Sequence, residues 1–164
     1  MYLTLLLTTL LAPPPDTTFA VRQGQRLAVS ARRGSITIKA WPRDEVRVTS
    51  DAEHGEAVRV EARGSLVTVS AGGRGSPAVD IVLWMPAWMP VAASGAQADI
   101  TVDGCACPIQ AETVSGDILV RGGKGNVDLQ AVEGGITATD ITGRVNAQTV
   151  NDDVHLSRIT GEVR

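Results

Sequence analysis

The chain has few aromatic residues, since Phe, Trp and Tyr together make up 3% of its 164 residues. Apolar residues nevertheless reach 43%, so the core of one domain has to be built from Val, Ile, Leu and Ala. Basic residues are not in excess either, because 15 Lys and Arg stand against 18 Asp and Glu. A nucleic-acid binder needs a basic surface, so we expect no nucleic-acid partner.

Residues that carry out chemistry are also scarce. His54 and His155 are the only histidines, and no second Cys or His pair accompanies the two cysteines, so a four-ligand zinc site is not supported. Neither G-x-S-x-G nor H-E-x-x-H occurs. The calcium-binding nonapeptide G-G-x-G-x-D begins at Gly122 but has Val127 in place of its Asp. We therefore expect no catalytic residues, no cofactor and no resident metal, and hence no enzyme.

No hydrophobic run is long enough for a transmembrane segment, which takes about 20 apolar residues. The leucine-rich stretch 1–12 carries no charge and suits the apolar region of a secretory signal. We interpret residues 1–20 as an export signal with a proline-rich spacer, cleaved after Ala12 or Ala20. This predicts an exported protein, periplasmic or at the cell surface. Because no Lys or Arg precedes the run, an ordinary buried strand or helix is the alternative.

A nine-residue repeat, in contrast, runs from Ala98 to the end of the chain. Apolar residues occupy its third and fifth positions with a residue between them, which is the alternation of a strand with one buried face. Gly is frequent at its first position, where it supplies a turn. The third positions are all β-branched: Ile100, Ile109, Ile118, Val127, Ile136, Val145, Val154 and Val163. We expect positions three and five to be buried and position two to be exposed.

Pairs of nines repeat better than single nines, because the segment ETVSGDI at 112–118 returns as QTVNDDV at 148–154. An 18-residue repeat with two strands describes one coil of a β-solenoid, whose coils stack about 4.8 Å apart as parallel strands. We predict an all-β fold in which residues 98–164 form a β-solenoid, right-handed by the usual crossover preference. Residues 21–97 carry less regular alternation and form an irregular β-rich cap continuous with it. An antiparallel sandwich would not need so strict a period.

Cys105 and Cys107 form the only cysteine pair. The two cysteines are two residues apart. On a regular strand their Cα atoms would be about 6.5–7 Å from each other, at the outer limit for a disulfide. A bend at Ala106 would bring them within range. A disulfide and a pair of buried free thiols both stay open.

Two further features of the sequence each allow two interpretations. In the segment WMPAWMP at 84–90, Trp84 and Trp88 either belong to a hydrophobic plug that closes the end of the core or form a contact surface for a partner. Asp99, Asp117 and Asp153 recur at 18-residue spacing, interrupted by Gly135. Stacked carboxylates would attract a divalent ion, but Asp beside a turn glycine usually binds the backbone, and we favour that role.

The repeat register continues to Val163, and no cap follows it. An uncovered parallel edge leaves backbone groups unpaired and the apolar ends of Ile159 and Val163 exposed, which invites another chain to add on. One interpretation is that the chain belongs to a longer protein, and the other is self-association or partner docking through this C-terminal edge.

The order of the motifs resembles a known family. The segments GSITI at 34–38, DEVRV at 44–48, MPA at 85–87 and the repeats that begin with TVSGDI at 113–118 are similar to the bacterial β-strand-repeat "putative adhesin" domain of unknown function. The resemblance covers residues 19–164 and implies an exported β-solenoid protein that has no catalytic residues to offer. We therefore predict a non-catalytic surface or periplasmic binding module, adhesive in the family's sense, with an unknown protein or glycan ligand. A self-stacking structural scaffold is the alternative.

Overall fold

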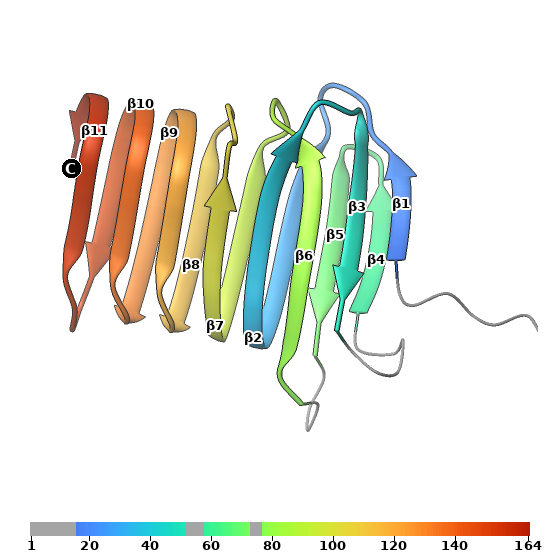
Figure 1. Ribbon diagram of the computed structural model, residues 1–164, viewed down its shortest axis with the longest axis horizontal. Helices are drawn as coiled ribbons and strands as arrows, with labels where there is room; N and C mark the ends of the chain where they lie inside the picture. The colour runs from blue at the N-terminus through green and yellow to red at the C-terminus, as the bar shows by residue number, and fades with distance from the viewer. Residues whose placement is uncertain (1–15, 52–57, 73–76) are drawn as a thin grey trace, which may run out of the picture.

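The computed structural model describes residues 16–51, 58–72 and 77–164 (Figure 1). These residues form eleven strands in one open sheet and no helix, so the predicted all-β class is confirmed. No helix in these ranges could cross a membrane. The apolar run 1–12 and His54 lie outside the described residues. The strands are β1 (Asp16–Ala20), β2 (Arg26–Trp41), β3 (Glu45–Ser50), β4 (Val58–Arg63), β5 (Leu66–Ala71), β6 (Val79–Pro86), β7 (Val91–Asp103), β8 (Ile109–Ser115), β9 (Ile118–Glu133), β10 (Ile136–Thr149) and β11 (Val154–Val163).

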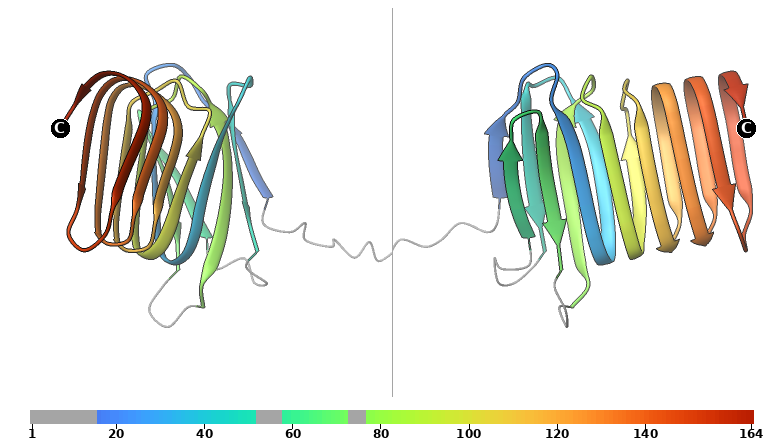
Figure 2. Two further views of the ribbon diagram at one scale, coloured as in Figure 1. Left: turned by 60° about the vertical axis from the view of Figure 1, so that its left-hand side comes forward. Right: turned by 180° about the vertical axis from the view of Figure 1, so that it is seen from behind.

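From β7 to β11 the strands pair in parallel with one constant offset along the chain. Ile109 of β8 lies between Val91 of β7 and Val127 of β9. The same offset joins β9 to β10 and β10 to β11, where Val145 lies between Val127 and Val163. Figure 2 shows these strands nested one behind another. The 18-residue period of the sequence is therefore the pairing register of the sheet.

The two apolar columns of the repeat supply the core, because alternate side chains of each strand point to one face. The third-position residues are buried at six successive units: Ile100, Ile109, Ile118, Val127, Ile136 and Val145. Burial stops at β11, where Val154 is 40% exposed and Val163 is 50% exposed. The predicted burial of the third position thus holds up to the last strand, which has a neighbour on one side only among the described strands. At the fifth position it holds up to Ala138, since Ala147 and Leu156 are only partly buried. The second position is exposed as predicted, except that Gly135 is half-buried.

The eighth position of the repeat divides into two sets that the nine-residue register does not distinguish. Ile141 is fully buried. Val114, Val132 and Val150, at the alternate corners, are 54%, 43% and 71% exposed. One corner of each 18-residue unit therefore turns its apolar residue into the core, and the other presents a row of valines to solvent.

The N-terminal strands join the same sheet with offsets that do not repeat. β2 pairs in parallel with β7, with Leu27 opposite Val91, and with β6 and β5 on other registers. β3 runs antiparallel to β1 and β6, and β4 runs antiparallel to β5. In Figure 1 these strands lie at the end of the molecule opposite β11. Their buried residues belong to the same hydrophobic cluster as the repeat region.

One corner of the repeat requires left-handed backbone in every unit. Gly104 and Gly122 have φ of 75° and 83°, and the equivalent Asp140 and Arg158 have φ of 58° and 50°. In the last two units an ion pair spans the corner, with the Arg158 guanidinium donating to Asp140 Oδ2 at 2.8 Å. This hydrogen bond lowers the pKa of the exposed Asp140 carboxyl.

Candidate functional site

The structure joins Cys105 and Cys107 by a disulfide. The chain leaves regular strand geometry between β7 and β8, where the Ala106 N–H donates to the Ala87 carbonyl at 2.9 Å. The two Cα atoms are consequently 5.4 Å apart, closer than on a regular strand. Both cysteines are buried. The bond therefore lies inside the corner, where it fixes the chain.

Replacing both cysteines by alanine is expected to lower the free energy of unfolding by about 1.6 kcal/mol, the loop entropy that a ring of roughly three residues removes from the unfolded chain. Urea denaturation of wild type and of the Cys105→Ala/Cys107→Ala variant under oxidising conditions measures the difference. A reductant should bring the two curves together. Identical midpoints without reductant would contradict a stabilising bond.

The segment 84–90 divides between core and surface. Met85 and Met89 are fully buried in the core. Trp84 and Trp88 are half-buried and already have partners. The Trp88 Nε1–H donates to Asp44 Oδ1 at 2.9 Å, and the Arg47 guanidinium lies 5.5 Å from the centroid of the Trp84 ring. β6 lies between β3 and β2, so the segment packs against the side of the core, away from either end of the stack.

Two of the three aspartates at 18-residue spacing, Asp99 and Asp117, bind backbone. Asp99 Oδ1 accepts from the Asp117 N–H at 2.9 Å, and Asp117 Oδ1 accepts from the Gly135 N–H at 2.8 Å. Each carboxylate therefore fastens the next unit of the repeat. Within the part of the chain that the structure describes, no three His, Cys, Asp or Glu side chains gather as a metal site would need.

The C-terminal candidates lie on β11. Val163 is half exposed, and Ile159 is partly buried against the core. Both belong to the inward column of their strand, so they mark the place where the core meets solvent. Among the described strands β11 pairs with β10 alone.

A second surface, which sequence reasoning missed, lies on the outward side of β8, of the β7 and β9 segments that pair with it, and of the β10 segment that pairs with β9. It holds five of the nine Asn and Gln of the chain: Gln110, Asn126, Gln130, Asn146 and Gln148. We call these five residues, with Glu112 and Asp128 among them, the carboxamide face. Gln110, Asp128 and Asn146 form one row across the strands, and Glu112, Gln130 and Gln148 form the next. Reading every eighteenth residue of the sequence would have revealed both rows.

Depressions follow one another along this face because short and long side chains alternate on it. The first, about 300 Å³, lies over Pro90, Pro108 and Ala92 and is bordered by Arg26, Gln110, Asn126 and Asp128. A second, about 140 Å³, adjoins it over Ser30 and Ser94. A third, about 410 Å³, follows the exposed valine row beside Gln130 and Gln148. The small residues leave room that the neighbouring carboxamides and carboxylates enclose.

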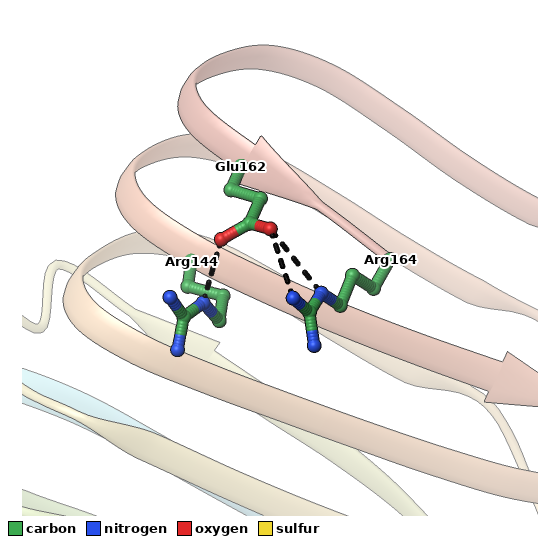
Figure 3. A network of polar contacts seen from close by, with 3 residues as sticks. All are labelled: Arg144, Glu162 and Arg164. Atoms are coloured by element: carbon green, nitrogen blue, oxygen red, sulfur yellow. Dashed lines mark hydrogen bonds and ion pairs between the residues drawn. The ribbon is translucent and has the colours of Figure 1, made fainter.

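Hydrogen bonds hold the long side chains of the face in place. Gln110 Nε2 donates to Glu112 Oε1 at 2.8 Å, and Asn146 Nδ2 donates to Asp128 Oδ1 at 3.1 Å. At the C-terminal end of the face, Glu162 accepts from Arg144 at 2.9 Å and from Arg164 at 3.2 Å (Figure 3). Hydrogen bonds to carboxylates thus fix the positions of Gln110 and Asn146.

The charges of this surface cancel. Its positive side chains are Arg26, Arg144 and Arg164, which line the depressions. Its negative side chains are Glu112, Asp128 and the Glu162 that pairs with two of the arginines. Three charges of each sign leave a surface that offers hydrogen bonds with no net charge.

Comparison with known proteins gives likeness to solved structures only. No protein-family model and no curated protein sequence matches the chain. A "putative adhesin" from Parabacteroides distasonis is similar over 90% of this chain and 77% of its own, at 11% identity and a TM-score of 0.45. One from Bacteroides fragilis covers 90% and 94% at 11% identity and 0.42, and a "putative cell adhesion protein" from Clostridium sporogenes covers 90% and 96% at 9% and 0.34. At these values the likeness assigns neither family nor function to this chain.

Proposed function

We propose that the protein is a non-catalytic binding module, exported to the periplasm or the cell surface, that adheres to a protein or glycan of a cell envelope through the carboxamide face. One observation supports this: planar polar side chains and hollows alternate along a single face of a continuous sheet. Strand pairing fixes the spacing of these side chains, and groups on paired strands are positioned more accurately than groups on loops.

The proposal is non-catalytic because of how the acids of the face are held. Glu112 and Asp128 each accept a hydrogen bond from a carboxamide. A general acid–base pair needs two titratable groups that exchange protons with a substrate, whereas carboxylates held by amides suit a hydrogen-bonding surface.

We also propose that residues 98–164 wind as a right-handed β-solenoid in which each coil is one two-strand repeat unit. The constant parallel offset between β7 and β11 supports this, because parallel neighbours need a crossover, and crossovers are right-handed in nearly all proteins. Equivalent side-chain bonds recur as well. Thr113 Oγ1 donates to the Ala98 carbonyl and Thr149 Oγ1 donates to the Gly134 carbonyl, each at 3.0 Å.

Retention on envelope fragments tests the binding role. Gln130→Ala/Gln148→Ala removes two exposed carboxamides of the face, and we expect at least about a tenfold weaker retention of the labelled protein. The matched control, Thr101→Ala/Thr137→Ala, changes outward residues of β7 and β10 in the other half of the repeat unit and should bind like wild type. Equal retention of both variants, or no retention of wild type, would contradict the proposal.

The second candidate function, a self-stacking scaffold, is favoured by a different observation. β11 presents an edge without a second neighbour among the described strands, and the inward residues Val154 and Val163 are exposed there. A parallel edge with apolar residues beside it is a template for another strand. In this proposal the occupant is a second copy of the chain, and the burial of Val163 would depend on protein concentration.

A further inference from the structure

The depression over Pro90 and Pro108 has the chemistry of a site for sugars. We propose that it binds an uncharged oligosaccharide, which lies along the direction in which the strands stack. This inference rests on the proposed function, because it names the ligand class of the same carboxamide face. Four properties of the depression support it: its length, its apolar floor, its polar rim and its balanced charge.

The length of the depression follows from the register. Arg26, Pro90, Pro108 and Asn126 occupy equivalent positions on successive strands, since Leu27 pairs with Val91, Val91 with Ile109, and Ile109 with Val127. Three strand spacings separate Arg26 from Asn126, or about 14 Å. One sugar ring is too short to reach both ends, so the depression suits several linked rings. Its volume of about 300 Å³ is at the lower end of the range for ligand sites.

The floor is apolar and rigid. Pro90, Pro108 and Ala92 form it, and proline rings neither donate hydrogen bonds nor lose rotamer freedom when a ligand covers them. Pyranose rings present C–H groups on their faces, and such a face packs on an apolar floor while the hydroxyl groups project sideways. Without an aromatic platform in the depression, we expect a modest affinity.

The rim faces those hydroxyl groups with planar polar side chains. Asp128 accepts one hydrogen bond from Asn146, and a carboxylate has about four acceptor sites, so it can take a pair of hydroxyl groups. Gln110 donates through Nε2 to Glu112 and keeps its carbonyl oxygen and its second N–H. The Arg26 guanidinium, which has no bonded partner among the described residues, adds donors at the opposite end.

Charge and backbone pairing argue against other ligands. Arginines and acids balance on the face, so neither a polyanion nor a polycation meets a complementary surface. A peptide that binds by strand addition needs an unpaired sheet edge. β8 has paired neighbours on both sides, β7 and β9, so its outward face offers side chains only.

Calorimetric titration of the full chain with cellotriose, maltotriose and tri-N-acetylchitotriose tests the proposal, with a heparin-derived trisaccharide as the charged probe. We expect saturable binding of at least one uncharged trisaccharide, with an affinity that added salt leaves unchanged. Asp128→Ala removes the acceptor pair and Ala92→Trp fills the depression, and each should weaken binding about tenfold or more. Asp103→Ala, an exposed aspartate on β7 away from the face, should stay within about twofold of wild type.

Three results would overturn the inference. The first is that no uncharged trisaccharide binds at concentrations up to about 10 mM. The second is that the charged probe binds more tightly than the uncharged trisaccharides. The third is that Asp128→Ala and Ala92→Trp both bind with wild-type affinity. Envelope retention distinguishes this failure from failure of the proposed function. If neither added trisaccharides nor Ala92→Trp changes envelope retention, the proposed ligand class is wrong but the proposed binding module stands. Trisaccharide binding without envelope retention supports the site and contradicts adhesion.

Discussion

Gly134→Ala is expected to lower the free energy of unfolding by more than about 3 kcal/mol, enough to unfold a domain of ordinary stability. Gly134 has a φ of 142°, which side chains other than glycine rarely adopt. A Cβ atom there would also overlap the carbonyl oxygen of Gly116, its counterpart in the preceding unit. Backbone strain and a backbone clash therefore add up at one position, and neither the carbonyl nor the paired strand can move away.

Two alanine variants serve as controls in the same urea denaturation experiment. Gly135→Ala changes the adjacent residue, where a Cβ would meet its nearest neighbour at 3.6 Å, and should stay within about 0.5 kcal/mol of wild type. Gly24→Ala has a φ of 91° with nothing within 4 Å, so it isolates backbone strain at about 1 kcal/mol. If Gly134→Ala is as mild as Gly24→Ala, the close approach of neighbouring units does not matter.

The turn glycines show what the repeat could and could not predict. Their recurrence at the first position of most nines predicts turns. The structure places Gly116 and Gly134 between strands, as this predicts. Gly125, Gly143 and Gly161 instead lie within β9, β10 and β11, with φ between 96° and 143°. Gly143 and Gly161 have a second reason that the sequence does not display, because a Cβ at each would overlap the backbone of the equivalent glycine in the preceding unit. A requirement that arises between units depends on stacking distance, which no local pattern encodes.

The core was predictable for a related reason. Burial of Ile118 and Val127 follows from strand alternation, a property of neighbouring residues. The burial of Ile141 and the exposure of Val132 were not predictable, because both residues occupy the eighth position of a nine-residue repeat. Which corner turns inward depends on the cross-section of the whole 18-residue unit.

The carboxamide face was hidden by its ordinary composition. Polar residues are expected on the outward side of any strand, so Gln110 and Gln148 draw no notice singly. Their significance comes from neighbours across strands, such as the Pro90 and Pro108 floor, and from the N-terminal register that brings Arg26 beside them. The offset between β2 and β7 has no period in the sequence, so that juxtaposition needed the structure.

Val145→Ala is expected to cost about 2 to 3 kcal/mol, from the lost burial of roughly two methylene groups plus the cavity they leave. The same change at Val163 should cost less than about 1 kcal/mol. The two valines are register partners on β10 and β11, but Val145 is fully buried and Val163 is 50% exposed. Residue type, strand position and substitution are identical, so the difference measures what covers each side chain.

Repeating the denaturation across a wide range of protein concentrations makes this pair a test of the scaffold hypothesis. If Val163→Ala stays mild at every concentration, β11 remains an open edge and self-stacking is contradicted. If its cost rises toward that of Val145→Ala as concentration increases, a second chain buries Val163, because only association makes stability depend on concentration. A large cost at every concentration would contradict the exposure of Val163 itself, since nothing within the described chain covers it.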